Sequence, residues 1–349
     1  MIFAPQTSVV RNICGRVPSW IRILPITPPT WSLELQKLEG HTSFVNAVAF
    51  SQDGSLLASV SSDLTVRLWN PATGQEVQKF EGHTSSVNAV AFSQDGSLLA
   101  SASYDQTIRL WNPATGQEVQ KLEGHTSSIR VVAFSQDGSL LASASSDRTV
   151  RLWNPATGQE VQKLEGHTSP VNAVAFSQDS SSLASVSYDR TVRLWNPATG
   201  QEVKKFEGHT SCINAVAFSQ DGSLLASASY DRTVRLWNPA TGQEVQKFEN
   251  MGYIRKLNFT NDDKNLLTDQ GTLSIKKKFI SIPTPESSSH QTLMIRNNWI
   301  QRDNRNFLWL PQEYRDSCST FYNNTFAFGL HSGQVSILNI DFSFQLSHG

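Results

Sequence analysis

Short apolar runs separated by polar turns follow one another along most of the chain, and residues 80–121 show the pattern clearly. Four such runs begin in this stretch: Val87–Phe92, Leu98–Ser103, Thr107–Trp111 and Glu118–Leu122. The first two are joined by the Asp95-Gly96 turn, where glycine supplies a positive φ. The last two are separated by a proline- and glycine-containing turn that the interior of a strand would not tolerate. The pattern therefore predicts a small antiparallel sheet of four strands.

The inner runs are almost continuously apolar or small instead of alternating, which indicates that both faces of the sheet are covered. The same unit occurs five times at a spacing of 42 residues, for example at His83 and His125 or at Trp111 and Trp153. Small sheets can bury both of their faces when they stack side by side around a common axis. We therefore expect an all-β propeller with regular repeats over residues 38–247.

Beyond residue 247 the repeat decays, but residues 248–341 still offer strands for two degenerate blades. The expected strands of the sixth blade are Tyr253–Thr260, Asn265–Thr268, Thr272–Ile275 and Asn298–Arg302. Those of the last blade are Phe307–Tyr314, Thr325–Leu330 and Gln334–Ile340. Residues 276–291 are rich in lysine, proline and serine, which is typical of an insertion.

The last unit lacks a fourth strand, and Leu33–Leu38 at the other end of the chain has the fourth-strand pattern. Pairing the two ends leaves no open sheet edge, so we expect a seven-bladed propeller over residues 33–341, closed by the N-terminal strand, with five regular and two degenerate blades. Six or eight blades fit the chain less well. Residues 1–32 are expected to be a linker segment and residues 342–349 a tail.

The Gly-His pair, followed 28 residues later by a Trp-Asp-like pair, resembles the signature of the WD40 family. The resemblance implies that each blade contains a hydrogen-bonded structural tetrad of a loop histidine, a second-strand serine, a turn aspartate and a third-strand tryptophan. On this chain the five tetrads would be His41, Ser59, Asp63, Trp69; His83, Ser101, Asp105, Trp111; His125, Ser143, Asp147, Trp153; His167, Ser185, Asp189, Trp195; and His209, Ser227, Asp231, Trp237. The chain departs from the signature in reading Trp-Asn in all five units, and asparagine can still make the side-chain-to-backbone bond that starts a turn.

Ser, His and Asp are also the residue types of a hydrolase triad, but five identical copies around a ring are typical of a scaffold. We therefore expect no enzyme activity, no catalytic residues and no cofactor. The histidines lack partners at metal-ligand spacing, and Cys14, Cys212 and Cys318 are too far apart for a zinc site or a disulfide framework. This cysteine usage favours a reducing, cytoplasmic location.

The distribution of charged residues indicates which kinds of partner the chain can bind. Lysine and arginine (29) and aspartate and glutamate (30) are interspersed and give a net charge of −1, which argues against a nucleic-acid partner. No apolar run is long enough for a membrane helix, so we expect no membrane insertion.

The positions at which the five near-identical units differ indicate where a partner would bind. Three such positions cluster: two in the loop and start of the first strand, and one just before the turn aspartate. The resemblance to WD40 proteins places them on the narrow top face, around the central channel, where a protein or peptide ligand would bind. With the matching residues of the sixth blade, the predicted partner-binding set is Phe44, Asn46, Ser62, Ser86, Asn88, Tyr104, Ser128, Arg130, Ser146, Pro170, Asn172, Tyr188, Cys212, Asn214, Tyr230, Tyr253 and Arg255.

The flanks resemble those of fungal NACHT–WD40 proteins, a group that includes vegetative-incompatibility and NLR-like proteins. The resemblance lies in Ala4-Pro5, Trp20-Ile21, Pro28–Trp31 and the stretch Leu308–Arg315. It implies that the chain is the sensor part of a self/non-self recognition system. A Gly-x-x-x-x-Gly-Lys-Ser/Thr phosphate-binding loop is absent from the sequence, so the NACHT domain would be missing. The alternative is a general WD40 adaptor or scaffold, as in mitochondrial fission or ubiquitin-ligase assemblies.

Overall fold

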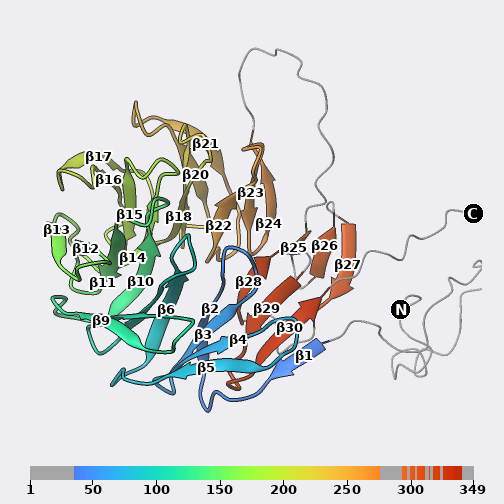
Figure 1. The fold of residues 1–349 in the computed structure, drawn as a ribbon. Helices are drawn as coiled ribbons and strands as arrows, with labels where there is room; N and C mark the ends of the chain where they lie inside the picture. The colour runs from blue at the N-terminus through green and yellow to red at the C-terminus, as the bar shows by residue number, and fades with distance from the viewer. Residues whose placement is uncertain are drawn as a thin grey trace, which may run out of the picture.

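The strands of the chain form eight sheets in the part that the structure describes, and seven of them are the blades of a propeller (Figure 1). The computed structural model describes residues 35–275, 293–296, 299–302, 305–310, 314, 317–322 and 325–339. The innermost strands contact one another around the axis in the order β28, β2, β6, β10, β14, β18, β22. The expected all-β, seven-bladed propeller is therefore confirmed.

Five regular blades each consist of four consecutive antiparallel strands. Blade one contains β2 (Val45–Phe50), β3 (Leu57–Ser61), β4 (Val66–Trp69) and β5 (Glu76–Phe80). Blade two contains β6 (Val87–Phe92), β7 (Leu99–Ser103), β8 (Ile108–Trp111) and β9 (Glu118–Leu122). Blade three contains β10 (Ile129–Phe134), β11 (Leu141–Ser145), β12 (Val150–Trp153) and β13 (Glu160–Leu164). Blade four contains β14 (Val171–Phe176), β15 (Leu183–Ser187), β16 (Val192–Trp195) and β17 (Glu202–Phe206). Blade five contains β18 (Ile213–Phe218), β19 (Leu225–Ser229), β20 (Val234–Trp237) and β21 (Glu244–Phe248).

Side chains from facing blades form the core. Between blades one and two, the buried cluster consists of Ala58, Val60, Val66, Leu68 and Phe80 from one blade and Val87, Leu99 and Trp111 from the next. The second strand of every regular blade is buried along its whole length, as the continuous apolar pattern predicts. Each blade therefore depends on its neighbours for most of its apolar burial.

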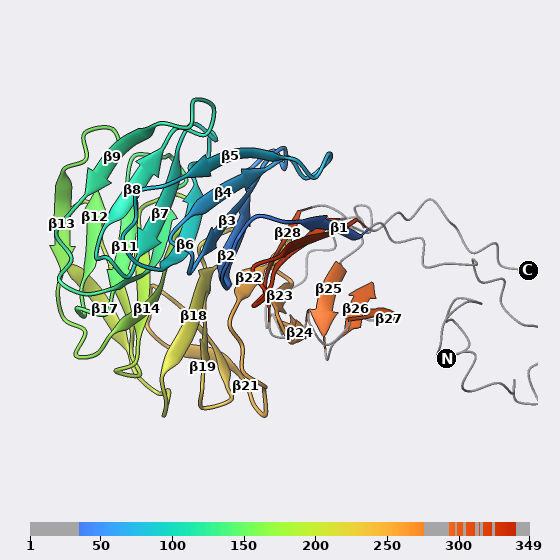
Figure 2. The same cartoon turned by 90° about the horizontal axis from the view of Figure 1, so that it is seen from below.

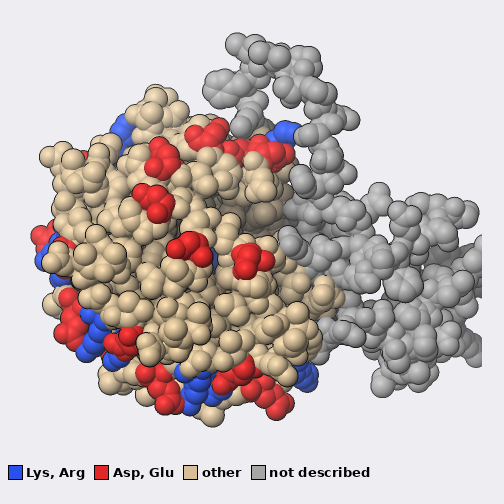
Figure 3. Space-filling model, viewed as in Figure 1, with Lys and Arg blue, Asp and Glu red and all other residues tan. Residues whose placement is uncertain are grey.

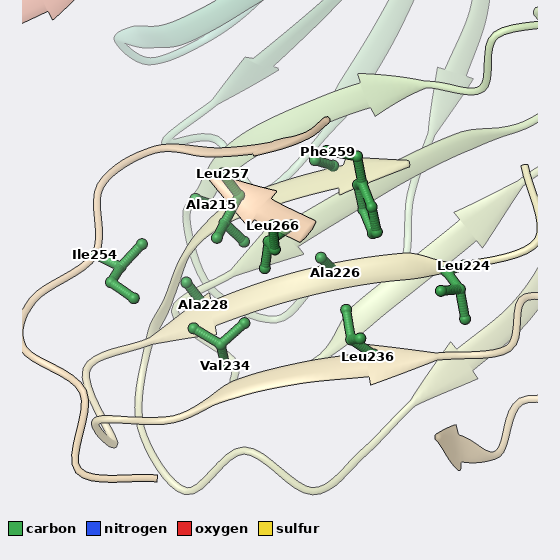
Figure 4. Close-up of a cluster of buried hydrophobic side chains, with 11 residues drawn as sticks. Ala215, Leu224, Ala226, Ala228, Val234, Leu236, Ile254, Leu257, Phe259 and Leu266 are labelled. Carbon is green, nitrogen blue, oxygen red and sulfur yellow. The ribbon is translucent and has the colours of Figure 1, made fainter. Parts of the chain in front are cut away.

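Blade six is short but packs in the same way. Its strands are β22 (Leu257–Phe259), β23 (Asn265–Thr268) and β24 (Gly271–Ser274), close to three of the expected strands. Ile254, Leu257, Phe259 and Leu266 from this blade pack against Ala215, Ala226, Val234 and Leu236 of blade five (Figure 4). Loss of the repeat signature has therefore not removed the apolar contact between the two blades.

Blade seven joins the two ends of the chain. It consists of β28 (Cys318–Tyr322), β29 (Thr325–Gly329), β30 (Val335–Asn339) and β1 (Leu35–Leu38), and β1 pairs with β30 from Leu35↔Leu338 to Leu38↔Val335. In the view from below, β1 lies beside the last strands of the chain (Figure 2). Closure by the N-terminal strand is therefore confirmed.

Two expected strands were wrongly placed. Asn298–Arg302, expected as the fourth strand of blade six, falls on β26 (Trp299–Arg302). This strand pairs with β25 (Leu293–Arg296) and β27 (Arg305–Trp309) in a separate three-stranded sheet. The apolar run expected as the first strand of the last blade falls on β27. The first strand of that blade is instead β28, whose sequence Cys-Ser-Thr-Phe-Tyr is too polar to stand out as an apolar run.

The separate sheet and its flank contact the closing blade through Ile300, Leu310 and Tyr314, which join Phe326 and Phe328 in one buried cluster. The apolar side chains of this sheet and its flank therefore pack against blade seven. The proposed linker (1–32), insertion (276–291) and tail (342–349) lie outside the described residues.

Blades four and six are linked to the preceding blade by the turn after their first strand. Ser180 and Asp263 occupy the place of glycine in the Asp-Gly turns, with φ of 58° and 53°. The Ser180 hydroxyl accepts a hydrogen bond from the backbone N–H of Gln136 at 3.1 Å, and the carboxylate of Asp263 accepts two, from Gln220 (2.8 Å) and Asp221 (3.0 Å). These bonds offset the conformational cost of a side chain at positive φ.

Candidate functional site

The structure brings the four predicted tetrad residues together in each regular blade. In blade three, His125 Nδ1 lies 2.7 Å from Asp147 Oδ2, and His125 Nε2 lies 2.8 Å from Ser143 Oγ. The indole N–H of Trp153 donates to the same Ser143 Oγ at 2.8 Å. The other four regular blades repeat these three contacts at 2.7–2.9 Å. The tetrad thus ties the loop, the second strand, the turn and the third strand of a blade to one another.

A threonine two residues after each aspartate is a fifth member that the sequence reasoning missed. Thr149 Oγ1 donates to Asp147 Oδ1 at 2.7 Å, and its backbone N–H donates to the same oxygen at 2.9 Å. The corresponding threonines are Thr65, Thr107, Thr191 and Thr233. The threonine is identical in all five units, and this constancy is the signal that could have revealed it.

Hydrogen bonding holds these aspartates ionised. Burial alone would raise the pKa of Asp231, but bonds from Thr233, the backbone of Thr210 and His209 outweigh it and lower the pKa to about 2. The corresponding bonds lower the pKa of Asp63, Asp105, Asp147 and Asp189 well below the usual range, again against the effect of burial. Burial also lowers the pKa of His209, since desolvation disfavours the imidazolium.

The tetrads therefore predict a loss of stability in acid. An aspartate whose pKa is depressed in the folded state stabilises the fold fully above its unfolded pKa of about 4, and this contribution is lost as pH falls toward about 2. His209 acts in the same direction below its unfolded pKa of about 6.5. Urea unfolding at a series of pH values should show the free energy of unfolding falling steeply below about pH 4. Asp147→Asn should be less stable at pH 7 and show a shallower acid slope, whereas equal stability at pH 5 and pH 2.5 would contradict the role of these bonds.

The asparagine that follows each tryptophan forms the turn that was expected of it. Asn112 Oδ1 accepts hydrogen bonds from the backbone N–H groups of Ala114 (2.9 Å) and Thr115 (3.0 Å). Equivalent bonds occur at Asn70, Asn154, Asn196 and Asn238. The Trp-Asn variant of the signature thus retains a local side-chain-to-backbone turn.

The predicted partner-binding positions meet at one end of the blades, which we call the top face; it consists of the loops before each first strand and the turns after each second strand. A backbone hydrogen bond joins the loop position to the turn position in every regular blade. Tyr104 N–H donates to Ser86 O at 2.9 Å, and Tyr230 N–H donates to Cys212 O at 2.9 Å. The pairs Ser62 with Phe44, Ser146 with Ser128, and Tyr188 with Pro170 are bonded in the same way at 2.9–3.0 Å.

The remaining predicted position coincides with a β-bulge. The register between first and second strands shifts there, for example between Val87 and Ala89, so Asn88 has no cross-strand partner. Its Nδ2 instead donates to Ile129 O of the next blade at 2.8 Å, and Asn46 and Asn172 likewise donate to Val87 O (2.8 Å) and Ile213 O (2.7 Å). Asn214 also occupies a bulge, but no bond to the next blade is formed in the described part of the chain. Simple two-residue alternation did not predict this geometry, in which Asn46, Asn88 and Asn172 link neighbouring blades.

Arg130 replaces asparagine at the bulge of blade three and makes a different set of contacts. Its Nε donates to Ser146 Oγ at 2.9 Å, and its Nη1 donates to Asn172 Oδ1 and Tyr188 Oη, both at 3.1 Å. The guanidinium carbon also lies 4.9 Å from the centre of the Tyr188 ring. Arg130 therefore holds the exposed ring of Tyr188 in place.

Aromatic side chains on the top face are exposed to solvent although they are large. Phe44, Tyr104, Tyr188, Tyr230 and Tyr253 are between 37% and 59% exposed. The rings of Tyr230 and Tyr253 are in edge-to-face contact at 5.1 Å, and those of Phe44 and His331 at 5.3 Å. The structure thus groups the predicted aromatic residues at one end of the propeller, with Arg255 exposed beside Tyr253.

No group of three or more His, Cys, Asp or Glu side chains in the described ranges is placed to hold a metal ion. None of the described segments is a helix long and apolar enough to cross a membrane. Cys212 and Cys318 are both free thiols.

These repeats and their tetrads define a β-propeller built of WD40 units. Residues 32–70 and 200–238 match the family model described as "WD domain, G-beta repeat", and residues 89–201 match a model described as "IFT122 first beta-propeller".

Similar stretches occur in several curated proteins. The chain is 41% identical over 75 residues to "Vegetative incompatibility protein HET-E-1" of Podospora anserina, a match that covers 21% of this chain and 6% of that protein. It is 40% identical over 73 residues to "Small ribosomal subunit protein RACK1y" of Oryza sativa subsp. japonica, covering 21% of each. It is 55% identical over 40 residues to "Notchless protein homolog" of Arabidopsis thaliana, covering 12% of this chain and 8% of the relative. The matches therefore span about a fifth or less of each of these relatives.

Proposed function

We propose that this chain is a non-catalytic recognition propeller that binds a protein or peptide ligand on its top face. The observation that carries the proposal is the gathering of exposed aromatic side chains at positions where otherwise near-identical repeats differ. Tyrosine and arginine are the side chains most enriched among the residues that dominate binding energy at protein interfaces. A propeller also presents such residues on rigid elements, which lowers the entropic cost of binding.

The Ser-His-Asp contacts resemble those of a hydrolase triad, and their surroundings argue for a structural role. Ser143 is completely buried, and its Oγ already interacts with both His125 and the indole of Trp153. A nucleophile must reach the substrate carbonyl, which a buried oxygen with two partners does not. The same arrangement in five blades supports a scaffold.

We further propose that the biological role of the propeller is that of the sensor in a fungal NLR-like system for self/non-self recognition. The partial identity with the vegetative incompatibility protein supports this role, together with the resemblance of the flanking segments. The alternative is a general adaptor, which the partial identities with the ribosomal and Notchless-like proteins favour. An adaptor holds two partners at once, so a ternary complex in size-exclusion chromatography would favour it, whereas a sensor requires one ligand.

Replacing Tyr104, Tyr188 and Tyr230 together with alanine should abolish ligand binding while leaving thermal stability almost unchanged. The three rings are partly exposed, so little buried area is lost, but each would be a contact residue. Dodecamer peptides selected on the wild-type protein from a phage-displayed library provide the ligand, and fluorescence anisotropy gives its affinity. Val119→Ala, an exposed apolar residue on the outer strand of blade two, is the control and should bind normally. Unchanged affinity in the triple variant would rule out the top face as the site.

A further inference from the structure

A further position on the top face differs between repeats, at the tip of the turn after the second strand. The residue that follows the tetrad aspartate is Leu64, Gln106, Arg148, Arg190 or Arg232. All five are exposed and have φ between 64° and 73°, a conformation that favours glycine. Blades three to five therefore display an arginine at this tip, whereas blades one and two display an uncharged side chain.

These three arginines extend a basic surface that already includes two predicted residues. Together, Arg130, Arg148, Arg190, Arg232 and Arg255 form what we call the arginine arc, which runs over blades three to six. Tyr188, Tyr230 and Tyr253 lie in the same sector of the top face, and each stands two residues before an arc arginine, namely Arg190, Arg232 and Arg255. Cationic and aromatic side chains are thus interleaved on one side of the ring.

None of the five arginines of the arc forms an ion pair within the described part of the chain. The tetrad aspartates of this sector are engaged by histidine and threonine. Glu165, Glu207 and Glu249 at the ends of the outer strands are paired with Lys163, Lys205 and Lys247. The carboxylate of Asp269 accepts a hydrogen bond from the backbone N–H of Arg255 at 3.1 Å, and burial raises the pKa of Asp269.

The opposite end of the blades carries the opposite charge. The turns between first and second strands each display an exposed aspartate: Asp53, Asp95, Asp137, Asp179, Asp221 and Asp262. Figure 3 shows one face of the propeller, on which acidic residues lie around the middle among uncharged residues and basic residues lie mainly toward the margin. The net charge of −1 therefore conceals a separation of charge between the two ends of the molecule.

We infer that the ligand of the top face is an acidic protein segment, with carboxylates against the arginine arc and an apolar or aromatic side chain against the tyrosines. The inference rests on the proposed function and adds the chemistry of the partner. Arginine binds carboxylates through paired N–H donors, and tyrosine supplies apolar area at low entropic cost. A nucleic acid fits less well, because the net charge of −1 gives the protein no long-range attraction for a polyanion.

The test uses the same selection of displayed dodecamers on wild-type protein at physiological salt. The key variant is Arg148→Gln/Arg190→Gln/Arg232→Gln, because glutamine already occupies this position in blade two at a φ of 71°. The control is Lys37→Gln/Lys79→Gln/Lys121→Gln, which removes the same charge from outer strands β1, β5 and β9, away from the arc. A single-stranded 20-nucleotide DNA serves as the competing polyanion.

The selected peptides should be enriched in aspartate and glutamate over the starting library. The affinity of these peptides should fall about tenfold in the arginine variant, equivalent to about 1.4 kcal/mol. In the lysine control it should change less than about twofold. Binding to the wild-type protein should weaken as the salt concentration is raised. Peptides without acidic enrichment, or with equal affinity for the arginine variant, would overturn the inference; if these peptides still lose affinity for the tyrosine variant, the proposed function stands. Tighter binding of the DNA would also overturn the inference. A selection that enriches nothing would overturn the proposed function and the inference with it.

Discussion

Trp153→Ala should lower the free energy of unfolding by about 3–5 kcal/mol. The Trp153 side chain is buried in the cluster between blades two and three, where it contacts apolar residues such as Leu110 and Leu141. Removing it leaves a cavity between two blades that cannot both collapse into it, and it removes the N–H donor to Ser143 Oγ. Urea unfolding followed by far-ultraviolet circular dichroism measures the loss without relying on the fluorescence of the deleted indole.

Two variants separate the parts of this effect. Trp153→Phe retains most of the ring volume but loses the indole N–H, so it should cost less than the alanine variant. Tyr104→Ala removes an exposed ring of the preceding blade and should cost less than about 1 kcal/mol. A loss below about 1 kcal/mol for Trp153→Ala itself would refute the packing role of the tetrad tryptophan.

The regular blades could be predicted from the sequence because every local signal agrees there. In blade two, the apolar runs, the Asp95-Gly96 turn and the Pro113-containing turn fix the strand ends to within a residue of the observed β6–β9. Periodicity adds independent support, since the same signals recur 42 residues apart. Consistency between local pattern and repeat, more than the propensity of any single residue, made this part predictable.

The degenerate part was less predictable because the apolar pattern alone does not say which sheet a strand joins. Leu310 and Tyr314 belong to an apolar stretch, yet they pack on the face of the closing blade that carries Phe326 and Phe328 and do not form its inner strand. The true inner strand, Cys318–Tyr322, is mostly polar; it forms a hairpin with Thr325–Gly329, and contact with β2, far away in the sequence, places it in the ring. Contacts between residues far apart in sequence leave no local signature.

Lys256 and Cys318 come from the inner edges of blades six and seven. Lys256, which precedes β22, and Cys318 in β28 lie close enough to affect each other's pKa. Burial raises the pKa of Cys318 to about 11, and the positive charge of Lys256 partly offsets the shift. The Cys318 thiol is therefore protonated at neutral pH, and its Sγ lies 3.4 Å from both Val45 O and Gly329 O.

The candidate site could be predicted in position but not in detail. Comparison of the repeats identified Tyr104, Tyr188 and Tyr230, because a position that differs between otherwise near-identical repeats can be recognised from a single sequence. The same comparison contained Arg148, Arg190 and Arg232, but their place beside the tyrosines emerges only from the turn geometry. The bulge at Asn88 was not predictable, since it is defined by the register of two strands and not by residue type.

Leu38→Asp should destabilise the propeller by about 3 kcal/mol or more. Leu38 is buried in β1 and packs among Val45, Trp69 and Val335, so a carboxylate there is taken out of water without a partner. The cost exceeds that of an ordinary core substitution because β1 is the strand that joins the two ends of the chain. Without it, β30 becomes an open sheet edge and blade seven loses its fourth strand. Urea unfolding gives the change in stability, and limited trypsin digestion reports whether the ring opens.

Lys37→Asp is the matched control, since Lys37 is exposed on the same strand and pairs with Ser336 through the backbone alone. It introduces the same carboxylate one residue away and should change stability by no more than about 0.5 kcal/mol. Digestion of Leu38→Asp under conditions that leave Lys37→Asp and the wild type intact would tie the effect to the packing of β1, because the two variants place the same carboxylate on adjacent residues that differ in burial. Equal resistance of all three proteins would mean that the ring is held by the contacts of β28 with β2, and that the N-terminal strand is dispensable.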